Sequence, residues 1–124
     1  MARTPSNMLP LGTTAPNFSL IDVTSNTSAS LDILKGEVGT MIMFICNHCP
    51  FVKHVNSTIA SMGHEYHGDK ISFVAISSND VINYPEDSPE LMKSNALENN
   101  FNFPYLYDES QQVAKDYDAA CTPD

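Results

Sequence analysis

Hydrophobic residues are concentrated in two short runs that predict β-strands. Residues 41–45 form an unbroken apolar run after Gly39, which is the pattern of a strand buried on both faces of a sheet. We therefore expect this segment to be the central strand. Residues 71–76 form a second strongly apolar run and predict another strand.

A helix is expected between these two strands. Apolar residues recur there every three or four positions, which places them on one helix face: Phe51, Val55, Ile59, Met62 and Tyr66. Gly68 is expected to end this helix. The order strand, helix, strand predicts a right-handed crossover between parallel strands.

The N-terminal part of the chain is expected to contribute one strand. Residues 1–12 are a polar, proline-containing lead-in, and the folded domain is expected at residues 13–124. Within residues 15–22, apolar positions 18 and 20 alternate as in a short strand. The segment 24–30 is rich in serine, threonine and asparagine, and it predicts a polar turn.

The segment after the second apolar run predicts a loop and a helix. The loop at residues 77–87 is long for a crossover connection, so it either lines a substrate groove or is a solvated insertion. Ser88 followed by Pro89 is a helix start signal, and we expect a helix over residues 89–99.

A short strand and a last helix are expected near the end of the sequence. Residues 103–107 predict the strand. Asp108 and Gln111 match a capping box for a helix that carries Val113 and Tyr117. The alternation of strands and helices predicts one layered α/β domain.

The composition excludes several classes of function. Six lysine and arginine residues against fifteen aspartate and glutamate residues give a net charge of −9. A basic surface for nucleic acid or for an anionic membrane is therefore not expected. No apolar run approaches the ~18 residues of a spanning helix, and no signal peptide is recognisable. We expect a cytoplasmic protein, in which its three cysteines serve redox chemistry or metal binding more often than structural disulfides.

The segment Cys46-Asn47-His48-Cys49 is the main candidate for chemistry. It leaves a predicted buried strand and opens a predicted helix, so Cys46 is expected at the helix N-terminus, where the helix dipole stabilises a thiolate. Cys46 is then the nucleophile, and Cys49, one helical turn further on, is the resolving thiol. Protonated His48 and Lys53 add positive charge, and we expect a lowered pKa for Cys46.

The strand, the cysteine pair and the helix resemble the redox centre of the thioredoxin superfamily. The resemblance is to its redoxin or AhpC/TSA-like, peroxiredoxin-related members. Residues 12–18 are similar to the usual opening of that family, and residues 117–124 are similar to its cis-proline segment. The resemblance implies that Cys46 and Cys49 are the catalytic pair.

The same resemblance assigns roles near the end of the sequence. It implies that Thr122 and Pro123 form the wall that docks substrate backbone beside the sulfurs, with a cis bond before Pro123. Cys121 is either an ordinary buried residue or an accessory thiol near this wall.

The implied fold is a thioredoxin-like three-layer α/β/α sandwich. Members of the family continue past the cis-proline into a β-hairpin and a helix, so the resemblance implies a C-terminally truncated domain that lacks these elements. Two positions depart from thioredoxins. Ile45 stands where tryptophan is usual, and Thr40 stands where a buried acid helps to move the proton of the resolving cysteine.

The resemblance implies a thiol–disulfide oxidoreductase that contributes to redox homeostasis without a bound cofactor. Its partners would be a disulfide-containing protein or small-molecule substrate and an upstream thiol reductant. Two alternatives remain open. The Cys49-Pro50 step resembles that of peroxiredoxins and would suit a thiol peroxidase, whereas Cys46, Cys49, His48 and His54 could form a metal-binding module.

Overall fold

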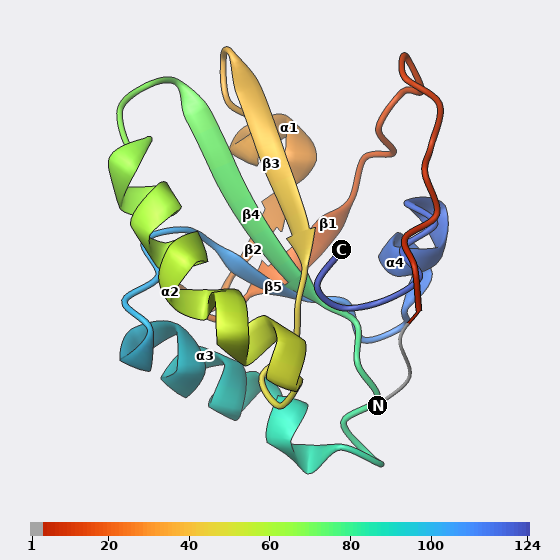
Figure 1. Cartoon of the computed structure of the whole chain (residues 1–124), viewed down its shortest axis with the longest axis vertical. Coiled ribbons are helices and arrows are strands. Elements are labelled where there is room, and N and C mark those ends of the chain that lie inside the picture. The colour runs from red at the N-terminus through yellow and green to blue at the C-terminus, as the bar shows by residue number, and fades with distance from the viewer. Residues whose placement is uncertain (1–3) are drawn as a thin grey trace.

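Five strands form one mixed sheet in the order β2-β1-β5-β4-β3 (Figure 1). The computed structural model describes residues 4–124. The strands are β1 (Ser19–Asp22), β2 (Thr27–Ser30), β3 (Gly39–Phe44), β4 (Ile71–Ser77) and β5 (Tyr105–Tyr107). β3, β4 and β5 run parallel, whereas β1 is antiparallel to both β2 and β5.

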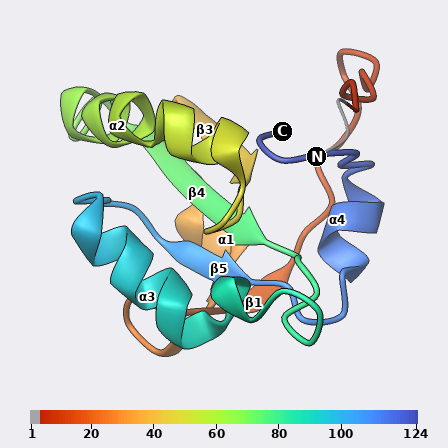
Figure 2. The ribbon, with the colours of Figure 1, turned by 60° about the horizontal axis from the view of Figure 1, so that its bottom comes forward.

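Helices cover both faces of this sheet (Figure 2). They are α1 (Leu31–Leu34), α2 (Pro50–Glu65), α3 (Pro89–Glu98) and α4 (Gln112–Asp116), with a 3-10 turn, η1 (Pro85–Asp87), before α3. α2 and α3 pack on one face, and α1 and α4 pack on the other. This confirms the expected three-layer α/β/α arrangement. Within residues 4–124, no helix is long and apolar enough to cross a membrane.

β4 supplies side chains to both layers, because successive side chains of a strand point to opposite faces. Phe73 and Ala75 join the cluster under α2 and α3. Val74 and Ile76 join the cluster with α1 and α4. This two-sided burial explains why the sequence of β4 is a continuous apolar run.

The crossover from β3 through α2 to β4 is confirmed, but the expected place of β3 is wrong. The two strands pair in parallel, with Met41 opposite Phe73. Within the described residues, β3 lies at the edge of the sheet and β5 lies in the middle. The side chain of Met41 is 40% exposed, so the start of β3 is not buried on both faces. Phe44 exchanges two backbone hydrogen bonds with Asp124, at 2.9 and 3.0 Å.

The face of α2 that packs on the sheet is offset from the predicted one. Its buried residues are Val52, Asn56, Ala60 and Gly63. The predicted stripe starts one residue earlier, and its first member, Phe51, is 45% exposed. Ile59 and Met62, which belong to the predicted stripe, are partly buried and pack against the core from its margin.

The predicted turn at residues 24–30 is partly wrong, since its second half is strand β2. The turn itself is held by Asp22, whose carboxylate accepts hydrogen bonds from the backbone N–H and hydroxyl of Thr24 at 2.9 and 2.7 Å. Pairing of β2 with β1 then makes a hairpin. Before this hairpin, residues 4–12 of the predicted lead-in contain no helix or strand, and residues 1–3 lie outside the described residues.

The helix predicted at residues 89–99 is confirmed as α3, with the Ser88 hydroxyl accepting the N–H of Leu91 at 3.3 Å. The predicted capping box of α4 is wrong. Gln111 is the N-cap and makes no side-chain cap. Asp108 caps the helix instead, because its carboxylate accepts the N–H of Ala114 at 3.0 Å.

Candidate active site

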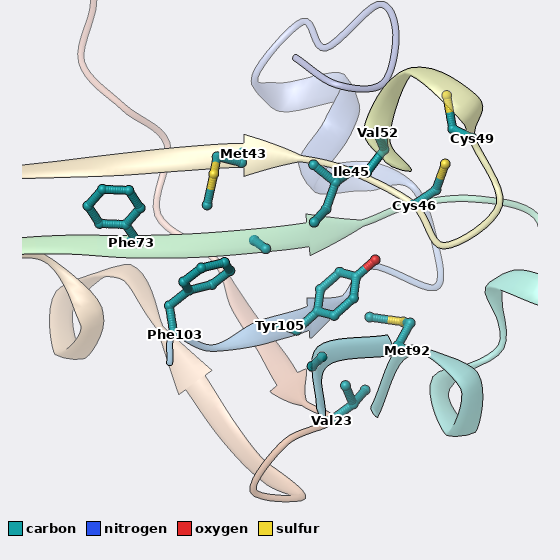
Figure 3. Packing of buried hydrophobic residues seen from close by; sticks show 12 residues of the cluster. Val23, Met43, Ile45, Cys46, Cys49, Val52, Phe73, Met92, Phe103 and Tyr105 are labelled. Carbon is teal, nitrogen blue, oxygen red and sulfur yellow. The ribbon is translucent and has the colours of Figure 1, made fainter. Parts of the chain in front are cut away.

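The two cysteines of the motif lie at the carboxyl end of β3, where the chain turns into α2 (Figure 3). Cys49 is the N-cap of α2 and Pro50 is its first residue. Cys46 lies three residues earlier, in the loop, so the expectation that it occupies the helix N-terminus is wrong. Both side chains are buried, at 1% and 0% exposure.

The segment at residues 122–124 meets both sulfurs, as the resemblance implies. The bond between Thr122 and Pro123 is cis. The Sγ of Cys46 lies 3.5 Å from the hydroxyl of Thr122, and the thiol of Cys49 donates to the Thr122 carbonyl at 3.5 Å. Thr122 thus contacts the two sulfurs through different atoms. The roles of Thr122 and Pro123 in docking a substrate stay predictions.

Asp87 is a buried acid of the site that the sequence did not point to. It is 0% exposed and ends η1, about forty residues along the chain from the motif. Its Oδ1 accepts the backbone N–H groups of Asn47 and His48 at 2.7 and 3.2 Å. Its Oδ2 pairs with His48 Nδ1 at 2.5 Å and accepts from the Asn79 side chain at 2.8 Å. Asp87 therefore ties the loop between the cysteines to the start of α3.

His48 is held on two sides. Its Nδ1 hydrogen bonds with Asp87, and its ring stacks on Tyr84 with centroids 5.0 Å apart and an interplanar angle of 5°. The hydrogen bond to the carboxylate and the stacking on the aromatic ring together fix the orientation of the His48 ring. A ring nitrogen of His48 lies within 4.8 Å of Cys46 Sγ, and the predicted effect of its charge on Cys46 stays a prediction.

The surroundings of Cys46 raise its pKa, and the expectation of a lowered value is wrong. Burial is the largest cause, and the negative charge of Asp87 adds to it. The hydrogen bond with the Thr122 hydroxyl acts in the opposite direction and lowers the pKa. The neutral thiol is therefore favoured at Cys46 relative to an exposed cysteine.

Tyr105 closes the base of the site. Its side chain is fully buried in the cluster between the sheet and α2 and α3 (Figure 3). Its hydroxyl donates to Asn47 Oδ1 at 3.0 Å. Burial raises the pKa of Tyr105, and the nearby Cys46 and Asp87 add to the shift. Tyr105 is thus a neutral hydrogen-bond donor that fixes the side chain of Asn47.

The other predicted site residues lie around this centre. Lys53 is exposed on α2, where its backbone N–H donates to the Cys49 carbonyl at 2.9 Å. Cys121 is half-buried, with its Sγ 3.6 Å from the Pro123 carbonyl, so it is not an ordinary core residue. The effects of Lys53 and Cys121 on the chemistry stay predictions.

A cleft of about 360 Å³ opens beside Thr122. Ser78 and Asn79 line it from the loop after β4, together with Lys115 of α4 and Cys121. Only the start of the loop at residues 77–87 lines this cleft, and its expected role in a substrate groove stays a prediction. Its last residue also supplies the buried carboxylate, which neither expectation included.

Three side chains of the site could offer ligand atoms to a metal. Among the described residues, atoms of Cys46, His48 and Asp87 lie within 4.8 Å of one another, whereas the predicted ligand His54 is exposed on α2. Both oxygens of Asp87 already accept N–H groups of the protein. The group is therefore a hydrogen-bonded network and does not fit an open metal site.

Comparison with known proteins places the chain in a family. Residues 11–124 match the model of the AhpC/TSA family. An uncharacterized conserved protein from Geobacillus kaustophilus is 54% identical, with a TM-score of 0.94 over 99% of this chain and 67% of that one. A hypothetical protein from Sinorhizobium meliloti 1021 is 39% identical, with a TM-score of 0.94 over 98% of this chain and 66% of that one.

More distant structures share the fold. A secreted Mycobacterium tuberculosis disulfide oxidoreductase, described as homologous to E. coli DsbE, is 19% identical, with a TM-score of 0.71 over 86% of this chain and 71% of that one. No curated protein matches the chain. The chain belongs to the AhpC/TSA family and has a thioredoxin-like fold. It spans about two thirds of the length of the two most similar structures described above.

Proposed function

We propose that the chain is a thiol–disulfide oxidoreductase in which Cys46 and Cys49 form the redox-active pair. One observation carries the proposal: both sulfurs contact Thr122 in a chain of the AhpC/TSA family. A pair of cysteines separated by two residues can form an intramolecular disulfide. A protein that reacts through a single cysteine does not need a second cysteine at this spacing.

The proposed reaction proceeds through a mixed disulfide. The thiolate of Cys46 attacks one sulfur of the substrate disulfide, and the other sulfur leaves as a thiolate that takes up a proton. Cys49, once deprotonated, attacks the Cys46 sulfur and releases the second substrate thiol. Two electrons have then passed from the protein to the substrate, and the protein holds a Cys46–Cys49 disulfide.

The remaining roles complete this proposal. Thr122 and Pro123 would present backbone to a bound disulfide, and His48 would offset the charge that Asp87 places beside Cys46. The substrate would be a protein or small-molecule disulfide. In the cytoplasm, the expected location, an upstream thiol reductant would regenerate the dithiol, and no bound cofactor is needed.

Mass spectrometry after alkylation with iodoacetamide tests the proposal. The chain is exposed to a mild oxidant, then alkylated with and without prior reduction. We expect two additional alkylated thiols after reduction, mapped to Cys46 and Cys49. Cys121→Ser should leave this result unchanged. Three thiols that stay reactive after oxidation would contradict the proposal.

Thiol peroxidase activity is the alternative function, and substitution of each cysteine in turn distinguishes it from disulfide reduction. If Cys49 were the peroxide-reactive thiol, peroxide consumption would survive Cys46→Ser and disappear in Cys49→Ser. The oxidoreductase proposal expects disulfide reduction to be lost in both variants, since Cys46 attacks and Cys49 resolves. Turnover of a disulfide and of hydrogen peroxide by the same two variants therefore separates the functions.

A further inference from the structure

The carboxylate of Asp87 binds backbone N–H groups in the loop between the two cysteines, an arrangement that thiol–disulfide exchange does not require. It accepts both backbone N–H groups of the two residues between the cysteines. N–H groups that point at a sulfur stabilise its thiolate. Here the N–H groups of Asn47 and His48 are directed to a carboxylate and do not stabilise a Cys46 thiolate, so among backbone groups that stabilisation comes from Cys49.

Asp87 also brings negative charge close to the sulfur. One of its oxygens lies within 4.8 Å of Cys46 Sγ, and the side chain is 0% exposed. Water screens such a pair poorly, so a carboxylate and a thiolate at this distance repel each other. Asp87 therefore disfavours the charged form of Cys46 by geometry and by charge.

The other titratable groups around Cys46 do not cancel this effect when the histidine is neutral. Cys49 faces Cys46 from the start of α2, and the neutral phenol of Tyr105 lies below from β5. His48 can carry positive charge, and its ring is bound to Asp87. A neutral His48 leaves Asp87 as a net negative charge beside the sulfur.

We propose that Asp87 poises the Cys46–Cys49 couple as an electron donor, so that the chain reduces disulfides and does not form them. The inference rests on the proposed function and adds the direction of electron flow, with Asp87 as a positioning residue. When the thiolate of a dithiol is not stabilised, the dithiol is less favoured relative to the disulfide. The reduction potential of the couple is then lower. Its substrates would be disulfides of higher potential. A dithiol of still lower potential, from the class of cellular thiol reductants, must regenerate it.

Redox equilibration with glutathione buffers tests this inference. The fraction of Cys46–Cys49 disulfide is measured at about pH 9, where enough Cys46 thiolate forms for its stabilisation to move the equilibrium. The main variant is Asp87→Asn, which keeps one oxygen for the two N–H groups and removes the charge. The matched control is Glu86→Gln, which removes an exposed charge one residue away.

We expect Asp87→Asn to shift the equilibrium at least about tenfold toward the dithiol, which corresponds to a potential about 30 mV more oxidising. Glu86→Gln should stay within about twofold of the original chain, as expected for a screened surface charge. An equal shift in both variants, no shift, or a shift toward the disulfide in Asp87→Asn overturns the inference.

Two further measurements keep the test decisive. If the chain forms no reversible disulfide, the proposed function and electron donation both fail, and a titration of thiolate absorbance in Cys49→Ser then shows whether Asp87→Asn still lowers the pKa of Cys46. If circular dichroism shows that Asp87→Asn is unfolded, His48→Gln replaces it. That variant removes the ring that hydrogen bonds Asp87 Oδ2, so more of the carboxylate's charge acts on Cys46 and the couple should shift toward the disulfide. The opposite shift overturns the inference.

Discussion

At the scale of single residues, Cys46 is controlled by contacts from three distant parts of the chain. The Thr122 hydroxyl contacts its sulfur, Asp87 lies within 4.8 Å of it, and Tyr105 holds the side chain of its neighbour Asn47. The hydroxyl favours the thiolate, whereas burial and Asp87 favour the thiol. The reactivity of Cys46 is therefore a balance that single substitutions can move in either direction.

Replacement of His48 should move this balance toward the thiol. His48→Ala removes the ring that hydrogen bonds Asp87 Oδ2, so the carboxylate acts on Cys46 without a partner that can carry positive charge. We expect the pKa of Cys46 to rise by at least ~0.5 unit, which is about a threefold loss of thiolate at neutral pH. The midpoint of the pH dependence of iodoacetamide alkylation measures it independently of access. His54→Ala, on the exposed side of α2, is the control. An unchanged midpoint in His48→Ala would contradict the prediction.

Removal of the Thr122 hydroxyl should act in the same direction. Thr122→Val keeps the shape of the side chain and the carbonyl that accepts from Cys49, but it loses the hydrogen bond to Cys46 Sγ. A net hydrogen bond of ~1 kcal/mol corresponds to roughly a fivefold change in the thiolate fraction. The same alkylation midpoint should therefore rise, and Thr58→Val, exposed on α2, should leave it in place. A lowered midpoint in Thr122→Val would refute the assigned contact.

At the scale of elements, local patterns located most of the strands and helices, but they did not show which strand lies at the edge of the sheet or which face of α2 is buried. The run at residues 71–76 predicted β4 correctly, because burial on both faces leaves a continuous apolar sequence. The same reasoning misplaced β3, since the pairing of strands is set by contacts far apart in the sequence. The stripe that starts at Phe51 was offset because this residue is exposed and Val52 packs inward. Asp87 escaped prediction for a similar reason, as its partners lie about forty residues away.

The packing of α2 gives a prediction at this scale. A Cβ at Gly63 would lie 2.5 Å from Asn102 Oδ1 and 3.0 Å from the Phe103 ring. Alanine is favoured over glycine in a helix by ~1 kcal/mol, but overpacking costs ~1–3 kcal/mol. Because Asn102 is also held by its hydrogen bond to the Gly63 carbonyl, we expect Gly63→Ala to lower the free energy of unfolding.

Urea denaturation followed by circular dichroism measures this change. Ser61→Ala, exposed on the same helix, is the control and should be neutral or slightly stabilising. A Gly63→Ala chain as stable as Ser61→Ala would mean that the loop at residues 102–103 can move away from α2.

At the scale of the whole molecule, the net charge of −9 bears on which disulfides reach the site. An excess of negative charge creates a potential that concentrates cations near the surface and repels anions, and salt screens it over about 10 Å at 0.1 M. Asp87 adds buried negative charge beside the sulfur that must attack. Surface and site therefore act in the same direction on a charged substrate.

This combination predicts a charge preference among small disulfides. Cystamine, which carries two ammonium groups, should be reduced faster at low salt than dithiodipropionate, which carries two carboxylates. The preference is expected to be at least about tenfold, the lower end of electrostatic effects on association rates. It should shrink when salt is raised, because screening removes the long-range part, and Asp87→Asn should reduce the part that remains. Initial rates of the two reductions, with each disulfide corrected for its reaction with a free thiol, measure the effect. Equal rates at low salt would contradict the prediction, because they would show that the charge of the protein does not affect how substrates reach the Cys46 sulfur.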